Sequence, residues 1–154
     1  KQKWEFGPLG FPQSDIITNE QGITYQLYEH DMVIAGNDKN GYSYVNKGIF
    51  DKWAELGFYD SGLGKSITNL MSNKNSGIEW QEFEHGFIVG NKAHGYFISM
   101  GPTREVWVKQ KWEFGPLGFP QSDIITGADG IQKQTYEGGT IFYSKKSGAY
   151  STLN

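Results

Sequence analysis

The sequence contains no cysteine, which excludes disulfide bonds, thiolate nucleophiles and cysteine metal ligands together. It also lacks any apolar run of 18 residues, so we expect no membrane insertion. Basic residues are in slight deficit, with 14 Lys and Arg against 17 Asp and Glu, which argues against a nucleic-acid partner. No signal peptide is recognisable, although the abrupt start suggests a fragment whose targeting segment lies elsewhere.

Aromatic residues and glycine are abundant instead. The 154 residues include 5 Trp, 9 Tyr, 10 Phe and 21 Gly. Aromatic side chains favour strands, and glycine favours turns. The composition therefore predicts a turn-rich, mainly β protein rather than a helical bundle.

One long string occurs twice. KQKWEFGPLGFPQSDIIT begins at Lys1 and recurs without change at Lys109, which is 108 positions later. Halfway between Leu9-Gly10 and Leu117-Gly118 stands Leu63-Gly64. The repeat period is therefore 54 residues, and a fixed period of this length indicates a repeat architecture.

This period divides the chain into three repeats, 1–46, 47–100 and 101–154, of which the middle one is degenerate. Repeats two and three begin with connector segments, 47–57 and 101–113, whereas the connector of repeat one is truncated. Two complete connectors for three cores favour a linear array over a closed ring. We therefore expect an elongated stalk of three stacked repeats, monomeric as an isolated fragment.

Within a repeat, the local pattern indicates a short connector helix and about four strands. Ile49, Trp53 and Leu56 form an apolar stripe for a helix that ends near Gly57, and Pro102 suits the first turn of the next connector. The segments DIITNEQGITYQLYE and MVIAGNDKNGYSYV each predict a β-hairpin around a turn that contains glycine.

The letters LGFP stand at Leu9–Pro12 and Leu117–Pro120, followed by QTYEGGTI at Gln134–Ile141 and SGAY at Ser147–Tyr150. In these motifs and in repeat length, essentially the whole chain resembles the LGFP repeat family. The resemblance implies small β folds stacked into a stalk, in actinobacterial envelope proteins that also carry mycolyltransferase or cell-wall hydrolase domains. It further implies an extracellular or cell-wall-associated location and attachment to the peptidoglycan–arabinogalactan wall.

Two tryptophans are candidates for stacking on sugar rings. Trp4 and Trp112 occupy the same position of repeats one and three, and Phe58 replaces them in repeat two. The alternative, which small cores favour, is that both pack beneath the connector helix.

Polar residues of the outer repeats are the other candidate glycan contacts. They are Gln13, Asp15, Gln26, Glu29, Gln121, Asp123, Gln134 and Glu137. The structural alternative is that Gln26 and Gln134 satisfy buried backbone groups, that the glutamates accept backbone N–H groups, and that the aspartates organise a turn. In repeat two Asn69 replaces the aspartate, so any site that needs this carboxylate is weakened there.

No catalytic pattern is present. The three histidines lack metal-ligand spacing, no GxSxG motif occurs, and we expect no enzyme activity, metal or cofactor. We expect a non-catalytic module that binds cell-wall polysaccharide through several weak contacts and anchors a larger surface or secreted protein. The alternative is a structural spacer, or a protein-binding stalk, without a glycan site of its own.

Overall fold

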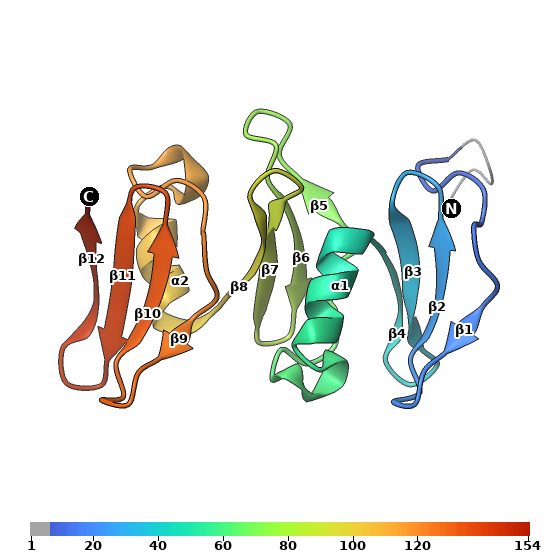
Figure 1. Ribbon diagram of the computed structural model, residues 1–154, viewed down its shortest axis with the longest axis horizontal. Coiled ribbons are helices and arrows are strands. Elements are labelled where there is room, and N and C mark those ends of the chain that lie inside the picture. Colours follow the sequence, from blue (N-terminus) through green and yellow to red (C-terminus); the bar gives the residue numbers. More distant parts are fainter. Residues whose placement is uncertain (1–6) are drawn as a thin grey trace. The chain divides into compact units, whose positions relative to one another are not determined.

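The computed structural model describes residues 7–154, and its elements follow the predicted repeat (Figure 1). The described part of repeat one, residues 7–46, comprises four strands: β1 (Ile17–Thr18), β2 (Thr24–Tyr28), β3 (Met32–Asn37) and β4 (Gly41–Asn46). Repeat two comprises α1 (Lys47–Glu55), η2 (Phe58–Ser61), β5 (Met71–Ser72), β6 (Glu79–Phe83), β7 (Gly86–Asn91) and β8 (Gly95–Ser99). Repeat three comprises α2 (Gly101–Lys109), η3 (Trp112–Phe114), β9 (Ile125–Thr126), β10 (Gln132–Tyr136), β11 (Gly139–Ser144) and β12 (Gly148–Leu153).

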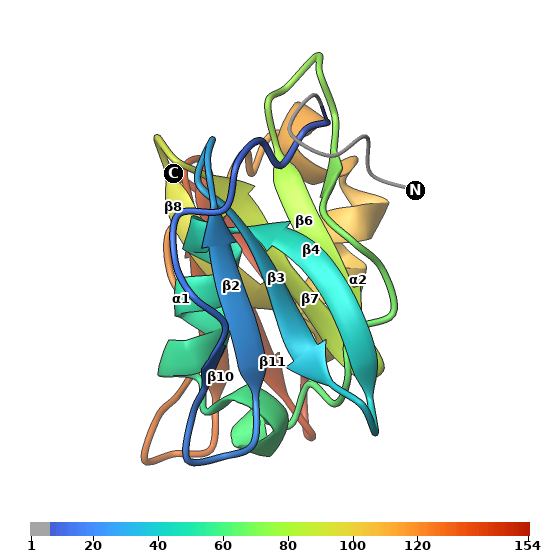
Figure 2. The ribbon, with the colours of Figure 1, turned by 90° about the vertical axis from the view of Figure 1, so that its right-hand side faces the viewer.

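The protein is mainly β, and residues 7–154 form three four-stranded antiparallel sheets and two short α-helices, in agreement with the predicted fold class. Each sheet is a meander, in the orders β1-β2-β3-β4, β5-β6-β7-β8 and β9-β10-β11-β12. Both predicted hairpins of repeat one are confirmed, since Ile17 pairs with Tyr25 and Ala35 pairs with Ser43. Figure 2 looks onto the first sheet, with β2, β3 and β4 side by side.

The chain divides into two compact units by contacts. The first comprises the residues up to Met71 together with Gln81–Glu84, and the second comprises Ser72–Trp80 and His85–Asn154. This division follows contacts rather than sequence repeats, so the three repeat boundaries and the elongated stalk stay predictions.

The connector helices form where the apolar stripe predicts them. The side chain of Asn46 caps the first helix by accepting the N–H of Ile49 at 2.8 Å, and Gly57, with φ 99°, follows its end. The second helix has Pro102 in its first turn and ends at Lys109, four residues before the predicted end of its connector. Neither of the helices within residues 7–154 is long and apolar enough to cross a membrane.

The Leu-Gly turn is held in the same way in every repeat. Gly10, Gly64 and Gly118 adopt φ values of 68°, 78° and 70°, which glycine reaches without steric cost. The neighbouring leucines Leu9, Leu63 and Leu117 are buried at 4 %, 0 % and 0 % exposure. Each turn therefore fixes one leucine in the core.

In the second unit, the core gathers residues from β7, α2, β10 and β11, from the loop before β6 and from the turn between η3 and β9. It consists of Ile78, Val89, Trp107, Leu117, Phe119, Tyr136 and Ile141. Trp80, Phe87 and Val106 pack against it while staying partly exposed. The border of this core, where aromatic side chains reach solvent, is where the main cavity opens.

Candidate functional site

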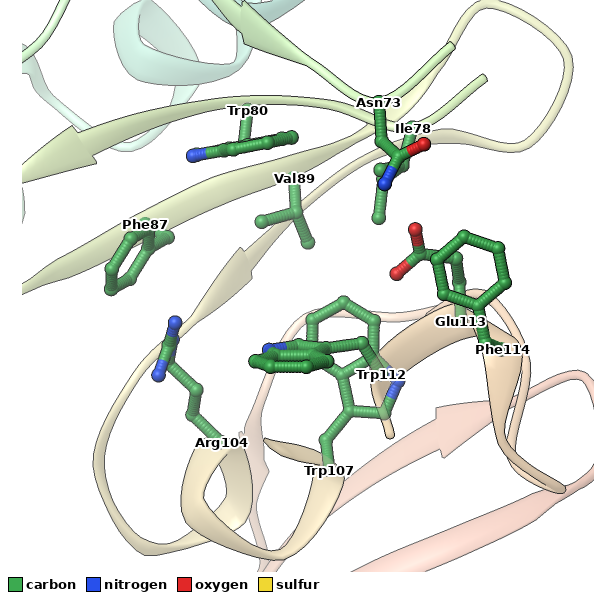
Figure 3. A pocket seen from close by; sticks show the side chains of 10 residues that line it. All are labelled: Asn73, Ile78, Trp80, Phe87, Val89, Arg104, Trp107, Trp112, Glu113 and Phe114. Atoms are coloured by element: carbon green, nitrogen blue, oxygen red, sulfur yellow. The ribbon is translucent and has the colours of Figure 1, made fainter. Parts of the chain in front are cut away.

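A cavity of about 340 Å³ lies in the second unit. Its lining is Asn73, Ile78, Trp80, Phe87, Val89, Arg104, Trp107, Trp112, Glu113 and Phe114. Figure 3 shows Trp80, Val89 and Phe87 on the strand side, facing Arg104 and Trp107 on the helix side. Aromatic walls, a few polar groups and a volume of this size are typical of small-molecule sites.

The strands and the helix hold this lining rigidly. Phe87 and Val89 are two residues apart on β7, so strand alternation points both side chains to the same face. Trp107 is 2 % exposed, packs on Tyr136 at 5.8 Å between ring centroids, and donates its indole N–H to the carbonyl of Gly118 at 3.0 Å. The deep wall of the cavity is therefore part of the core.

Trp112 reaches the cavity because the turn after α2 is left-handed. Lys111 and Trp112 have φ values of 69° and 51°, which are uncommon for residues with a side chain. The Trp112 side chain is 45 % exposed. The packing beneath the connector helix that the sequence favours for this residue is therefore wrong for Trp112, since nearly half of its side chain stays exposed. Trp4 lies outside the described residues.

In the first unit, the space equivalent to this cavity is filled. Phe50 occupies the position in α1 that Arg104 occupies in α2. The Phe50 side chain is 7 % exposed, and its ring centroid lies 5.0 Å from that of Tyr25 and 5.8 Å from that of Phe58. Phe58 is the equivalent of Trp112 and has a similar φ of 54°. The two connectors thus share a backbone path, and the Phe-to-Arg exchange leaves space in the second.

Polar groups stand around the aromatic lining. The guanidinium of Arg104 lies 3.9 Å from the centroid of the Phe87 ring, a cation–π geometry. Ser76 donates its hydroxyl to Glu113 Oε1 at 2.6 Å, which fixes that carboxylate from the loop between β5 and β6. This loop spans residues 73–78, one residue more than the corresponding loops 19–23 and 127–131. A ligand in the cavity would meet hydrogen-bond donors and acceptors beside aromatic faces.

The glutamates predicted as glycan contacts accept backbone N–H groups of the Leu-Gly turn. Glu29 Oε2 accepts from Phe11 at 3.0 Å, and Glu137 Oε2 accepts from Phe119 at 2.8 Å. Glu84 does the same for Lys65 at 3.1 Å in repeat two. The structural alternative is thus confirmed for these residues, and a further contact with glycan stays a prediction.

The glutamines also form internal hydrogen bonds. Gln134 is 0 % exposed, donates to the carbonyls of Ile98 and Ser122 at 2.8 and 2.9 Å, and accepts from the hydroxyl of Tyr136 at 2.9 Å. Burial raises the pKa of that Tyr136 hydroxyl well above its ordinary value. Gln26 donates to the carbonyl of Ser14 at 2.9 Å but remains half-buried, at the edge of a second cavity of about 210 Å³.

The two aspartates differ although their local sequences are identical. Asp123 Oδ1 accepts the N–H of Ile98 on β8 at 2.8 Å, whereas Asp15 is exposed. Asn69 takes the same part in repeat two, accepting from Tyr44 on β4 at 2.9 Å. Gln13 and Gln121 are exposed, and their backbone N–H groups bond to strands β2 and β10.

Of the sequence-predicted site residues that lie within residues 7–154, the structure places only Trp112 at the larger cavity. Arg104, Glu113 and Trp80 were missed because the preceding copy carries different residues at these positions, namely Phe50, Tyr59 and Tyr25. Of the three, only Glu113 has an identical counterpart in another repeat, Glu5. Comparison of the two connectors at the 54-residue spacing contains a signal, since a buried phenylalanine position becomes arginine. No cluster of three or more His, Asp or Glu suited to a metal ion occurs within residues 7–154.

No family model and no curated protein matches the chain. Among solved structures, similarity is found to selenomethionine-substituted virginiamycin B lyase from Staphylococcus aureus, at 13 % identity, a TM-score of 0.25, and coverage of 99 % of this chain and 43 % of that chain. A streptogramin B lyase structure gives 13 % identity, a TM-score of 0.25 and coverage of 96 % and 42 %. The chain thus spans less than half of either protein, and similarity at this TM-score carries no inference about its fold or activity.

Proposed function

We propose that this protein is a non-catalytic module that binds cell-wall polysaccharide of the peptidoglycan or arabinogalactan type and anchors a larger surface or secreted protein. The observation that supports it most is the 45 % exposed ring of Trp112 at the mouth of an aromatic cavity. The C–H groups of a sugar ring carry partial positive charge and are attracted by the negative face of an aromatic ring. The resemblance to LGFP repeats supplies the choice of polymer.

The polar lining of the cavity suits sugar hydroxyls, because these groups both donate and accept hydrogen bonds. Arg104 can donate to them, Glu113 can accept from them, and Asn73 can do both. A cavity of about 340 Å³ is small, so each contact with a long polymer is weak. A polymer repeats its epitope, and attachment to several sites raises the effective concentration at each one.

The exposed residues Gln13, Asp15 and Gln121 are proposed as additional polar contacts of the same polymer. They are accessible, and two of them, Gln13 and Asp15, lie within three residues of Pro12. Their contribution is smaller than that of Trp112, since an exposed polar contact exchanges bonds to water for bonds to ligand.

The proposal is tested by sedimentation with insoluble actinobacterial wall material. Removal of the ring in Trp112→Ala should weaken retention about two- to tenfold, which corresponds to the ~0.5–1.5 kcal/mol of one aromatic contact. Tyr150→Ala is the matched control, because Tyr150 is also an exposed aromatic residue, at 48 %, but lies outside the cavity. The protein should release no soluble sugar or peptide from the wall, and time-dependent release would contradict a non-catalytic role.

A structural spacer is the second candidate, and one observation favours it. Gln134, Glu137 and Asp123 were expected to contact glycan, and all three form hydrogen bonds within the protein. A titration with soluble wall fragments separates the two functions. Saturable binding that Trp112→Ala weakens supports the glycan module, whereas no binding at any fragment concentration supports the spacer.

A further inference from the structure

In this protein, the backbone of the last strand of one sheet is hydrogen-bonded by residues of the next repeat in the chain. In the first unit, Tyr44 of β4 donates its N–H to Asn69 at 2.9 Å and accepts from the N–H of Leu70 at 2.9 Å. In the second unit, Ile98 of β8 donates its N–H to Asp123 at 2.8 Å and accepts from Gln134 Nε2 at 2.8 Å. Tyr44 and Ile98 are 54 residues apart, so the backbone N–H and C=O of the same repeat position are bound in both units.

This contact buries the receiving face. Gln134 and Ile141 are 0 % exposed and Tyr136 is 2 % exposed on the third sheet. The helix that follows the bound strand adds to the cover, since Trp107 contacts Tyr136 in the second unit and Trp53 contacts Phe83 in the first. Receiving residues of this kind are therefore buried where the last strand of a preceding sheet and its following helix pack on them.

The first sheet carries the same receiving residues without a cover among residues 7–154. These are Asp15, Gln26, Tyr28 and Ile34, which we call the receiving face of the first sheet. Asp15 is exposed, and the other three are half-buried around the cavity of about 210 Å³. The helix α1 packs on the opposite face, where Phe50 contacts Tyr25. Figure 2 shows this arrangement, with α1 behind β2 and β3.

The matching strand edge is present at β12. Ser151 pairs with Ile141 as Tyr44 pairs with Ile34, so it occupies the position of the bound peptide group in β4 and β8. β12 is the outer strand of its sheet, and an edge strand presents unpaired N–H and C=O groups. In the equivalent strand β4, the N–H and C=O of Tyr44 point away from β3, toward Asn69 and Leu70. The backbone N–H and C=O of Ser151 therefore point away from β11.

We propose that the receiving face of the first sheet binds the β12 edge of a second copy of this chain. Asp15 accepts the N–H of Ser151 from the other copy, and Gln26 donates to the Ser151 carbonyl. The contact is head-to-tail, so each copy keeps one unused end and further copies add to it. A second copy is the occupant that the internal contacts specify, because the face offers the side-chain acceptor seen in both of them and the glutamine donor seen in the contact between Gln134 and Ile98.

This association is weaker than the contacts inside the chain. Those contacts are intramolecular and include a helix with a buried tryptophan, Trp53 or Trp107, whereas the proposed association joins two separate chains through the β12 edge. Monomers therefore dominate at low concentration, and the proposal concerns concentrated protein or copies held close together on a surface. It does not depend on glycan binding at the aromatic cavity, which lies in the second unit, and shares with the proposed glycan contacts only Asp15.

Sedimentation velocity of the full chain from ~10 µM to ~1 mM tests the proposal, because small interfaces are transient at low concentration. The weight-average sedimentation coefficient should rise with concentration without reaching the plateau of a closed dimer. Asp15→Ala should shift the rise to at least threefold higher concentration. Asp15→Asn should behave as the parent does, because Asn69 performs the same task in repeat two. A monomer throughout this range, or equal behaviour of both variants, overturns the proposal.

A mixing experiment tests the head-to-tail direction. Ser151→Pro removes the N–H that Asp15 binds, and proline is tolerated on the outer side of an edge strand. Each variant alone should associate only at concentrations at least threefold higher than the parent requires, but Asp15→Ala retains its β12 edge and Ser151→Pro retains its receiving face. Their equimolar mixture should form a dimer and nothing larger. A mixture that sediments as its components do overturns the proposal, with thermal melting of each variant confirming that both are folded.

Discussion

The carboxylate of Glu137 lies directly over Gly118, and a Cβ placed on that glycine would stand 2.5 Å from Glu137 Oε2. The same oxygen accepts the N–H of Phe119, the next residue of the turn. Gly10 and Glu29 show the same relationship at 2.5 Å in repeat one. The Leu-Gly turn and the glutamate that follows the second strand of each sheet therefore form one hydrogen-bonded unit, which explains why both recur in every repeat.

Substitution of this glycine should destabilise the fold more than substitution of an open one. Gly118→Ala meets both the positive φ of 70° and the Glu137 carboxylate, and should lower the free energy of unfolding by about 2 kcal/mol or more. Gly130→Ala is the control, because its φ is 77° but nothing lies within 4 Å of a Cβ there. It should cost about 1 kcal/mol. Urea unfolding measures both, and equal losses would show that the carboxylate contact is unimportant.

Asp123 should act as a hydrogen-bond acceptor rather than as a charge. Asp123→Ala leaves the N–H of Ile98 without its side-chain acceptor and should cost about 1–2 kcal/mol of stability. Asp123→Asn should stay within ~0.5 kcal/mol of the parent, since asparagine fills this position in repeat two. Asp15→Ala should leave the melting temperature of the dilute protein unchanged. If Asp123→Ala melts like the parent but loses wall retention, Asp123 is a glycan contact instead.

Filling the cavity should remove glycan binding without damage to the fold. Arg104→Phe recreates the arrangement of the first unit, where Phe50 packs between Tyr25 and Phe58. We expect retention on wall material to fall at least as far as in Trp112→Ala, while the melting temperature stays equal or rises.

Arg104→Lys is the control variant, because lysine keeps the positive charge at this position but does not fill the cavity as phenylalanine does. It should reduce binding less than Arg104→Phe. Stronger binding by the phenylalanine variant would show that the ligand does not enter the cavity.

Tyr136 should make the protein sensitive to alkali. Burial raises its pKa above the ordinary value of 10, so above about pH 10 the unfolded chain loses this proton while the folded protein retains it. The unfolded state then binds fewer protons, and stability falls as pH rises. Tyr136→Phe should cost about 1 kcal/mol at pH 7, through the lost bond to Gln134, but should show a shallower decline from pH 9 to 11. Urea midpoints across this range decide it, and parallel declines would assign the alkaline sensitivity to other tyrosines.

Local structure could be predicted from the sequence because its causes are local. The stripe of Ile49 and Trp53 places the connector helix, and Gly57 ends it at the expected position. Strand alternation and glycine-containing turns give the two hairpins, and the 54-residue period multiplies each element. These features depend on backbone preference and on spacing along the chain, which are visible without coordinates.

Roles that depend on a distant partner could not be predicted. Asp15 and Asp123 stand in the same 18-residue string, yet only Asp123 meets a strand edge, because a preceding sheet is present beside it and none covers Asp15 within residues 7–154. The exposure of Trp112 likewise depends on Arg104, eight positions earlier, where Phe50 closes the corresponding space in the first unit. The sequence by itself determined the repeat, its helices and its strands. Only the tertiary structure decided which copy of a residue is scaffold and which is open to a ligand, because burial is a property of the neighbours that packing brings together.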